Sequence, residues 1–153
     1  WRRSRSAPGS TPAARAEAAL DRVEEEMPQQ AQSILIVEDD ADVRGALTVF
    51  FEGEGYRVVE AAHGEEALRH LRANAAGFCI ILLDLWMPVM NGWEFRAEQL
   101  KDPALAQVPV LVLTADHAAA KGASGLAAVG CFTKPIEMDR LLEQVAHYCG
   151  PTP

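Results

Sequence analysis

Five short apolar runs alternate with longer segments between residues 33 and 148. The first, third and fourth runs are almost continuously hydrophobic, which is typical of strands covered on both faces of a sheet. The second and fifth are more mixed in polarity, as expected for strands near a sheet edge. By residue number the runs are 33–37, 56–60, 79–83, 108–113 and 130–133.

The segments between these runs carry apolar residues at helical spacing. In the first segment Val43, Leu47 and Phe50 repeat at i, i+4 and i+7, which predicts an amphipathic helix. The fourth segment is rich in alanine but contains Gly122 and Gly125. Each glycine costs about 1 kcal/mol in a helix interior, so we expect this helix to be the least stable. The predicted helices span 41–52, 64–74, 92–100, 117–128 and 137–148.

This (βα)5 alternation predicts an α/β fold: a doubly wound parallel sheet with helices on both faces and right-handed crossovers. Ligands in such folds bind at the carboxyl ends of the strands. Four of the five runs carry polar or charged residues at that end. The first is followed by Glu38, Asp39 and Asp40, the third ends at Asp84, the fourth at Thr114, and Lys134–Pro135 follows the fifth.

Carboxylates that converge at one edge repel each other unless a cation lies among them, and oxygen ligands in a compact site favour Mg²⁺. Asp84 is central and suits a nucleophile that forms an aspartyl phosphate. We expect Mg²⁺ to bridge Asp39, Asp84 and the phosphoryl oxygens. Lys134 would offset the phosphoryl charge, and the Thr114 hydroxyl would donate a hydrogen bond to it. Asp40 fits helix capping instead.

These residues together resemble the receiver domain of two-component response regulators, the CheY-like family. The resemblance covers about residues 33–148 and includes the phosphoacceptor signature Asp-x-x-Met-Pro-x-x-Asn/Asp-Gly. It implies a flavodoxin-like three-layer sandwich with a five-stranded parallel sheet of strand order 2-1-3-4-5. The matching segments are 34–40, 54–68, 84–92, Thr114–Ala115 and Lys134–Pro135.

The resemblance also implies roles for single residues. Asp84 would accept a phosphoryl group from a histidine kinase or a histidine phosphotransfer protein. Asp39 would bind Mg²⁺ directly, Glu38 largely through water, and the Trp86 main-chain carbonyl would be a further ligand. Thr114 would take part in the switch, and the peptide bond before Pro135 would be cis. The domain would catalyse only its own phosphorylation and autodephosphorylation.

Two positions depart from the family pattern. The family commonly has Tyr or Phe three residues before the lysine as a switch aromatic, and this position is Cys131. Phe132 is adjacent, but side chains alternate across a strand, so we expect it to face the other way. This places the coupling of Thr114 to a rotating ring in doubt. The second departure is Trp86, whose indole would shield the acyl phosphate and slow self-dephosphorylation.

Composition narrows the environment and the partners. The net charge is −8, and all of that excess lies in residues 31–153, which disfavours direct nucleic-acid binding by this domain. No apolar run is long enough to span a bilayer, and we expect a cytoplasmic protein without membrane insertion. The three cysteines, Cys79, Cys131 and Cys149, are far apart and are expected to be free thiols.

Residues 1–30 are expected to form an N-terminal extension or linker, partly disordered or helical, before a receiver domain at 31–150. The stripe Leu20, Val23 and Met27 fits either the end of a coiled coil or a frayed helix. Because the chain begins with Trp1, we expect a fragment of a longer protein. Both a stand-alone regulator and the receiver of a hybrid histidine kinase fit, with an unidentified downstream protein.

Two other functions are weighed against the phosphoacceptor. A phosphate-independent binding scaffold of receiver-like fold is the main alternative, although the intact Asp84, Thr114 and Lys134 argue against it. An aspartate-nucleophile phosphatase needs a second Asp two residues after the nucleophile, where this chain has Trp86. A dinucleotide-binding fold is also disfavoured, because no GxGxxG follows the first predicted strand.

Overall fold

The computed structural model of the chain describes residues 32–152. The predicted N-terminal extension at 1–30, with its apolar stripe, lies outside the described residues. Among the described residues, no helix has the length and apolar character that a membrane crossing requires.

Five parallel strands form one sheet in the order β2-β1-β3-β4-β5, which confirms the predicted fold class and strand order. Every residue of β3 and β4 is buried, whereas the edge strands β2 and β5 are partly exposed. The burial follows the run polarity, because only the central strands are covered on both faces. The strands are β1 (Ser33–Val37), β2 (Arg57–Ala61), β3 (Phe78–Asp84), β4 (Val110–Thr114) and β5 (Gly130–Thr133).

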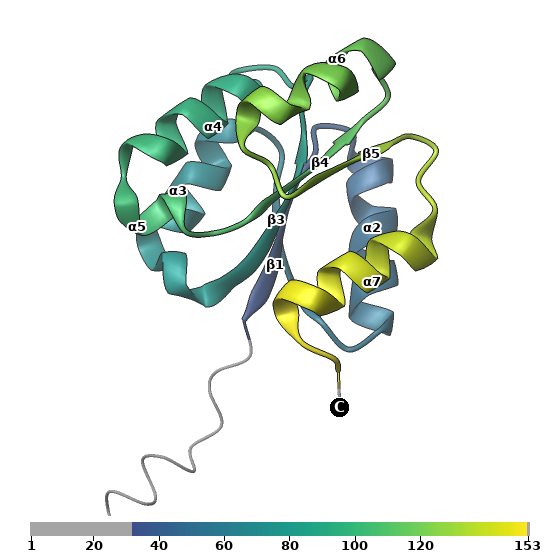
Figure 1. The fold of residues 1–153 in the computed structure, drawn as a ribbon. Coiled ribbons are helices and arrows are strands. Elements are labelled where there is room, and N and C mark those ends of the chain that lie inside the picture. Colours follow the sequence, from purple (N-terminus) through teal and green to yellow (C-terminus); the bar gives the residue numbers. More distant parts are fainter. Residues whose placement is uncertain (1–31, 153) are drawn as a thin grey trace, which may run out of the picture. The chain divides into compact units, whose positions relative to one another are not determined.

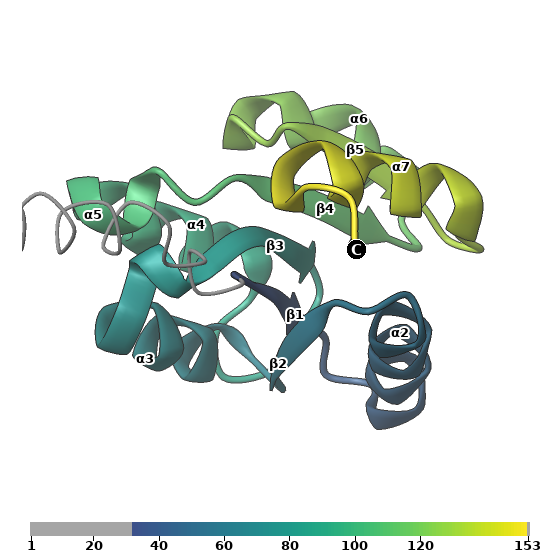
Figure 2. The same ribbon diagram turned by 90° about the horizontal axis from the view of Figure 1, so that it is seen from below.

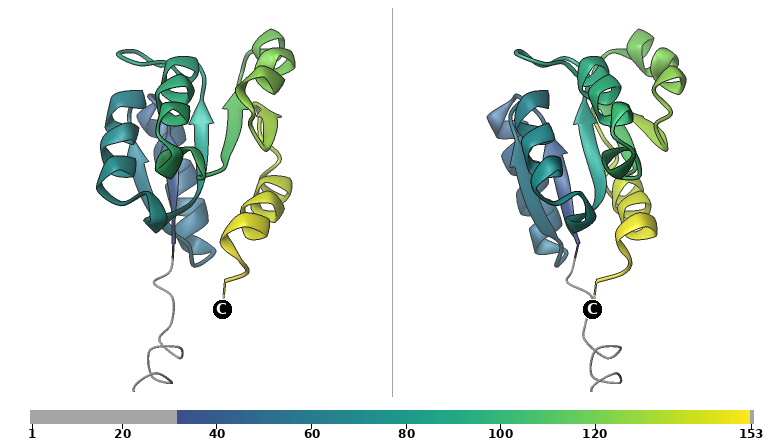
Figure 3. Two further views of the ribbon diagram at one scale, coloured as in Figure 1. Left: turned by 60° about the vertical axis from the view of Figure 1, so that its left-hand side comes forward. Right: turned by 90° about the vertical axis from the view of Figure 1, so that its left-hand side faces the viewer.

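Helices cover both faces of the sheet. Figures 1 and 2 show α2 and α7 on one side of the strands and α3, α4 and α5 on the other. In Figure 3 the strand arrows run toward one common end, near which α6 lies. The helices are α2 (Ala41–Gly53), α3 (Gly64–Asn74), α4 (Gly92–Lys101), α5 (Pro103–Ala106), α6 (His117–Gly122) and α7 (Met138–Cys149), with the 3₁₀ turns η1 (Ala75–Gly77) and η2 (Ala123–Leu126).

The core divides into two clusters, one on each side of the sheet. Leu35 and Val37 of β1 face the α3–α5 side, whereas Ile34 and Ile36 face the α2–α7 side. This alternation follows from the two-residue period of a strand. Both faces of the central strands are therefore fully used for packing, and polar chemistry is left to the strand ends.

The fourth predicted helix, 117–128, is shorter in the structure than expected. The α-helix α6 ends at Gly122 and continues as the 3₁₀ turn η2, after which Ala127 adopts a left-handed conformation with φ 52°. The two glycines explain the early end, since they weaken the helix where it would have to continue. Ala123 and Leu126 are buried and hold the turn against the α3–α5 side.

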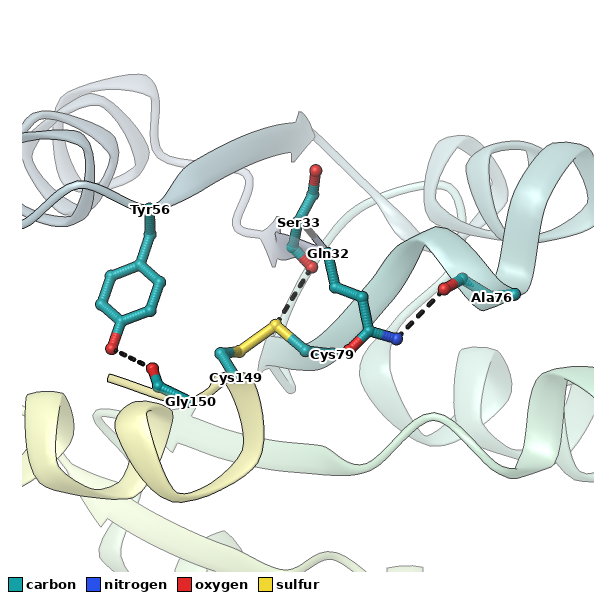
Figure 4. Close-up of a disulfide and its surroundings, with 7 residues drawn as sticks. All are labelled: Gln32, Ser33, Tyr56, Ala76, Cys79, Cys149 and Gly150. Carbon is teal, nitrogen blue, oxygen red and sulfur yellow. Dashed lines mark hydrogen bonds between the residues drawn. A yellow bond between two sulfur atoms is a disulfide. The ribbon is translucent and has the colours of Figure 1, made fainter. Parts of the chain in front are cut away.

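The prediction of free thiols is wrong for two of the three cysteines. Cys79 in β3 and Cys149 at the end of α7 form a disulfide with a Cα–Cα distance of 5.1 Å, and Cys131 is free and exposed. Figure 4 shows the bond between the start of β3 and the last turn of α7. Because 70 residues separate the two cysteines in sequence, their proximity becomes visible only when α7 packs back along the sheet.

Candidate functional site

Three carboxylates meet at the carboxyl ends of β1 and β3. Glu38 and Asp39 follow directly after β1, and Asp84 is the last residue of β3, its neighbour in the sheet. One carboxylate oxygen of each residue lies within 4.8 Å of the others. Glu38 and Asp84 are buried and Asp39 is exposed. The structure therefore brings together the three carboxylates among the four metal ligands named from the sequence.

Lys134 reaches this cluster from the carboxyl end of the edge strand β5. Its Nζ lies 2.7 Å from Glu38 Oε2 and 4.0 Å from Asp84 Oδ2. Its backbone N–H donates to the Thr114 carbonyl oxygen at 2.8 Å, which ties it to the end of β4. The peptide bond between Lys134 and Pro135 is cis. One cation thus faces two buried carboxylates, and the cluster keeps a net negative charge.

The pKa of Asp84 is raised from its ordinary value of 3.8 to about 7. Burial of the carboxyl is the largest cause, and the nearby charge of Glu38 is the next. Lys134 and the backbone N–H of Trp86, 3.4 Å from Asp84 Oδ1, lower this pKa in part. Near neutral pH the Asp84 carboxyl therefore binds a proton, which offsets the charge of the cluster as a bound cation would. The all-oxygen donor set fits a hard divalent cation such as Mg²⁺.

Thr114 is fully buried at the end of β4, directly after Leu113, the residue that pairs with Asp84 in the sheet register. Its hydroxyl oxygen accepts a hydrogen bond from the backbone N–H of Asp116 at 3.1 Å. A hydroxyl can accept and donate together, so the Thr114 proton is left for another acceptor at the strand ends. This is the donor role expected for a group next to a phosphoryl site.

The loop after Asp84 is shaped by its glycine and its helix cap. A Cβ at Gly92 would lie 2.8 Å from the Asp84 carbonyl oxygen, so any side chain here would displace the backbone that carries the acceptor. Asn91 caps α4 through a reciprocal pair of hydrogen bonds with Glu94. Val89 sits at φ 68°. The Met-Pro-x-x-Asn-Gly pattern thus forms a tight loop that ends directly in a helix.

Trp86 is held in a way that the sequence did not reveal. Its indole Nε1–H donates to Asp116 Oδ2 at 3.2 Å, and its ring packs edge-on against Trp93 with centroids 4.7 Å apart. Even so, its side chain is 58% exposed. The carboxylate of Asp116 also caps α6 by accepting from the N–H groups of Ala118 and Ala119. Neither this capping role of Asp116 nor its contact with Trp86 was predicted from the sequence.

Cys131 stands at the position of the family's switch aromatic, and Phe132 follows it in β5. Cys131 is exposed at the edge strand, and burial of part of its side chain raises the pKa of its thiol. Phe132 packs with the α2–α7 cluster, which confirms that it faces away from Cys131. The roles of Thr114 and Cys131 in switching, and of the Trp86 carbonyl as a ligand, stay predictions.

A buried polar network beside α6 was missed at the sequence level. The Arg96 guanidinium donates to the carbonyl oxygens of Leu126 and Ala127 at 2.9 and 3.1 Å and to Gln99 Oε1 at 2.7 Å. It ties α4 to the turn that replaces the second half of the predicted fourth helix. The only signal was an Arg and a Gln three residues apart among apolar helix positions, which is too weak to interpret alone.

Fold and site together define a receiver domain of two-component signalling. The family model of the response regulator receiver domain matches residues 34–146, and the chain belongs to this family. The matched range contains all of the carboxylates described above, together with Thr114 and Lys134.

Comparison with known proteins gives the same assignment. The chain is 34% identical over 114 residues to the uncharacterized transcriptional regulatory protein YkoG of Bacillus subtilis, which covers 73% of this chain and 48% of that protein. It is 30% identical over 118 residues to the CAI-1 autoinducer sensor kinase/phosphatase CqsS of Vibrio cholerae, 74% of this chain and 17% of that protein.

Among solved structures, the response regulator TrrA of Thermotoga maritima, in complex with Mg²⁺-BeF, superposes with a TM-score of 0.68 at 29% identity. The match covers 76% of this chain and 98% of TrrA. By contrast, the chain spans about half the length of the first relatives that it matches by sequence.

Proposed function

We propose that this domain accepts a phosphoryl group on Asp84 in a reaction that requires Mg²⁺. The observation that supports the proposal most is the group of three carboxylates within 4.8 Å, faced by the Lys134 ammonium. A cluster held together only for stability would not place two buried carboxylates against one lysine, since unpaired buried charge is costly.

The proposed reaction transfers the phosphoryl group from a phosphohistidine. An Asp84 carboxylate oxygen attacks phosphorus, a P–O bond forms, and the P–N bond to the donor imidazole breaks. The imidazole keeps the electron pair of that bond and takes up a proton. The nucleophile must be ionised, and the pKa of about 7 for Asp84 means that loss of the competing proton is part of activation.

Each neighbouring residue has a task in this scheme. Glu38, Asp39 and Asp84 would hold Mg²⁺, which when bound supplies positive charge to the phosphoryl oxygens. Lys134 would exchange its contact with Glu38 for one with the phosphoryl group. The Thr114 hydroxyl would donate to a phosphoryl oxygen while still accepting from the Asp116 N–H. Positioning and charge account for most of what phosphoryl transfer needs.

We further propose that the donor is a histidine kinase or a histidine phosphotransfer protein. An apolar groove of about 460 Å³ lies between α2 and the start of α7 and is bordered by Lys134. A donor helix seated there would bring its histidine to the site. Apart from its own phosphorylation and dephosphorylation, we expect no enzymatic activity. The lining residues include Val43, Leu47, Phe50, Ile136 and Met138.

The downstream output belongs to the protein as a whole. YkoG is a transcriptional regulatory protein and CqsS a sensor kinase/phosphatase, and these two relatives represent the two arrangements proposed here. In one the receiver controls an attached or separate regulator, and in the other it belongs to a hybrid kinase. In both we propose that the receiver works in the cytoplasm and does not itself contact DNA.

The test is the intact mass of the full chain after incubation with acetyl phosphate. We expect one added phosphoryl group, and only when Mg²⁺ is present. Asp84→Asn should show no adduct, whereas Asp40→Asn should label like the parent, because Asp40 only caps α2 and Asn caps equally well. Absence of an adduct under rapid sampling would favour the phosphate-independent binding scaffold instead.

A further inference from the structure

A covalent link joins two elements at the end of the sheet away from the carboxylates. Cys79 is the second residue of β3 and Cys149 the last residue of α7. Asp84 lies five residues further along β3, which at strand spacing is roughly 16 Å away. The disulfide is therefore separate from the proposed phosphorylation chemistry, and neither of its cysteines takes part in it.

The two cysteines of the disulfide differ in their exposure to solvent. Cys79 is 4% exposed, whereas Cys149 is half-buried at the helix end. A groove of about 610 Å³ borders the Cys79 side of the bond and is lined by Phe78, Cys79 and Tyr148 among others, but not by Cys149. Thiol–disulfide exchange requires the attacking thiolate to reach one of the two sulfurs, and Cys149 is the more exposed of the two residues.

The reduced form would find its polar groups satisfied. Cys79 Sγ lies 3.5 Å from the Ser33 carbonyl oxygen, a contact drawn in Figure 4. A disulfide sulfur has no hydrogen to donate, so this contact becomes a hydrogen bond only when Cys79 is a thiol. The buried thiol would then have an acceptor in place, and opening of the bond leaves no unpaired donor in the core.

Helix α7 keeps other attachments when the bond opens. The Tyr56 hydroxyl donates to the Gly150 carbonyl oxygen at 2.9 Å, directly after the helix (Figure 4). Leu141 and Val145 are fully buried against the sheet. Reduction should therefore loosen the last turn of α7 and leave the domain folded.

We propose that Cys79 and Cys149 form a thiol–disulfide exchange site whose substrate is a dithiol reductant. A thiolate of the dithiol attacks Cys149 Sγ, the intramolecular S–S bond breaks, and the Cys79 sulfur leaves with the electron pair and takes up a proton. The second thiol of the reductant then attacks the mixed disulfide and releases Cys149 as a thiol. Two electrons and two protons pass to the chain, and the reductant becomes a disulfide.

The bond closes a loop of 70 residues that includes Asp84, Thr114 and Lys134. Disulfides that close long loops restrict the unfolded chain most in the chain-entropy treatment. The redox state would therefore change the stability of the part of the domain that carries most of the site. It would do so without altering any contact among the carboxylates.

Thiol counting by mass on the full chain tests the site. In protein handled in air without reductant, alkylation under denaturing conditions should add one label, at Cys131. After dithiothreitol treatment of the folded protein it should add three labels. Cys131→Ser serves as the matched control and should take no label before reduction and two labels after it. Three labels in the parent before reduction would overturn the proposal.

Kinetics and melting separate an exchange site from a purely structural bond. Reduction of the folded protein should be at least tenfold faster than global unfolding measured under the same conditions, and the mixed disulfide trapped with excess monothiol should map to Cys149. The reduced protein and Cys149→Ser should both melt on the order of 10 °C lower than the oxidised parent. The proposed exchange site is refuted if reduction is no faster than global unfolding, or if reduction leaves the Tm unchanged. If Cys149→Ser does not fold, the Tm measurement is repeated with Cys79→Ala.

Discussion

Replacement of Asp84 by asparagine should stabilise the metal-free domain above neutral pH. In the folded state the pKa of Asp84 is about 7, against 3.8 ordinarily, because of burial and the charge of Glu38. Between these two values the folded chain binds a proton that the unfolded chain has released. Its stability therefore falls as pH rises through this window and levels off above about 7. The Asp84→Asn variant would have no such dependence, because an amide does not titrate.

The magnitude follows from the two pKa values. Each pH unit within the window corresponds to about 1.4 kcal/mol, so between pH 5 and pH 8 the parent should lose roughly 2–3 kcal/mol relative to Asp84→Asn. The assay is urea unfolding at several pH values in the presence of a chelator. Mg²⁺ added at pH 8 should recover much of the loss for the parent only, because a ligand that binds the folded state stabilises it.

Asp40→Asn is the matched control, since Asp40 is exposed and its side chain only caps α2. Its unfolding free energy should run parallel to that of the parent at every pH. The reasoning is refuted if the Asp84→Asn and parent curves run parallel between pH 5 and pH 8. Equal stabilisation of the parent and of Asp84→Asn by Mg²⁺ would likewise show that the carboxylate cluster is not the cation site.

Three further substitutions test neighbouring contacts. Lys134→Met should lower the unfolding free energy at pH 8 by about 2 kcal/mol, because it leaves buried Glu38 without its cation; urea unfolding measures this. Gly92→Ala should destabilise by about 2 kcal/mol and weaken Mg²⁺ binding in titrations, since its Cβ would press on the Asp84 carbonyl. Trp86→Asn should shorten the lifetime of the phosphoryl group on Asp84 several-fold. The lifetime is measured by following the intact mass of the protein after removal of the phosphoryl donor.

Each of these predictions has its own contrary outcome. Lys101→Met is the control for Lys134→Met, because it removes an exposed lysine that pairs with Glu98. An equal loss of unfolding free energy in the two variants would show that the contact of Lys134 with Glu38 is not the cause of the loss. Mg²⁺ binding unchanged in Gly92→Ala would mean that the loop yields without moving the acceptor. An unchanged lifetime in Trp86→Asn would reject shielding by the indole, and Trp93→Leu would then show whether the Trp86–Trp93 contact matters at all.

The fold was predictable because the pattern of polarity is unusually clean. Runs such as 79–83 are apolar at every position, which is typical of a strand covered on both faces. The site was predictable for a related reason: parallel strands deliver their ends to one edge, so Asp84 and the acids after β1 had to meet. Single residues carried little information, but their positions at the ends of different strands carried much.

What the sequence could not show are contacts between side chains distant along the chain. The Cys79–Cys149 bond depends on how far α7 runs back along the sheet, which no local pattern encodes. The same holds for Trp86 with Asp116, and for the Arg96 network, which depends on the turn that replaces the end of the fourth predicted helix. That turn was missed because alanine favours helix while Gly122 opposes it, and burial of the following residues decided the balance.

The central claim, that Asp84 carries the phosphoryl group, is tested most directly by trapping the acyl phosphate. Borohydride reduces an aspartyl phosphate to homoserine, and the tryptic peptide 73–96 contains only two carboxylate side chains, Asp84 and Glu94. After acetyl phosphate and Mg²⁺ treatment, thiol reduction and digestion, we predict homoserine at position 84 in this peptide, with none when Mg²⁺ is omitted. Homoserine at another aspartate, or an unchanged peptide from protein that carries the phosphoryl mass, would contradict the claim.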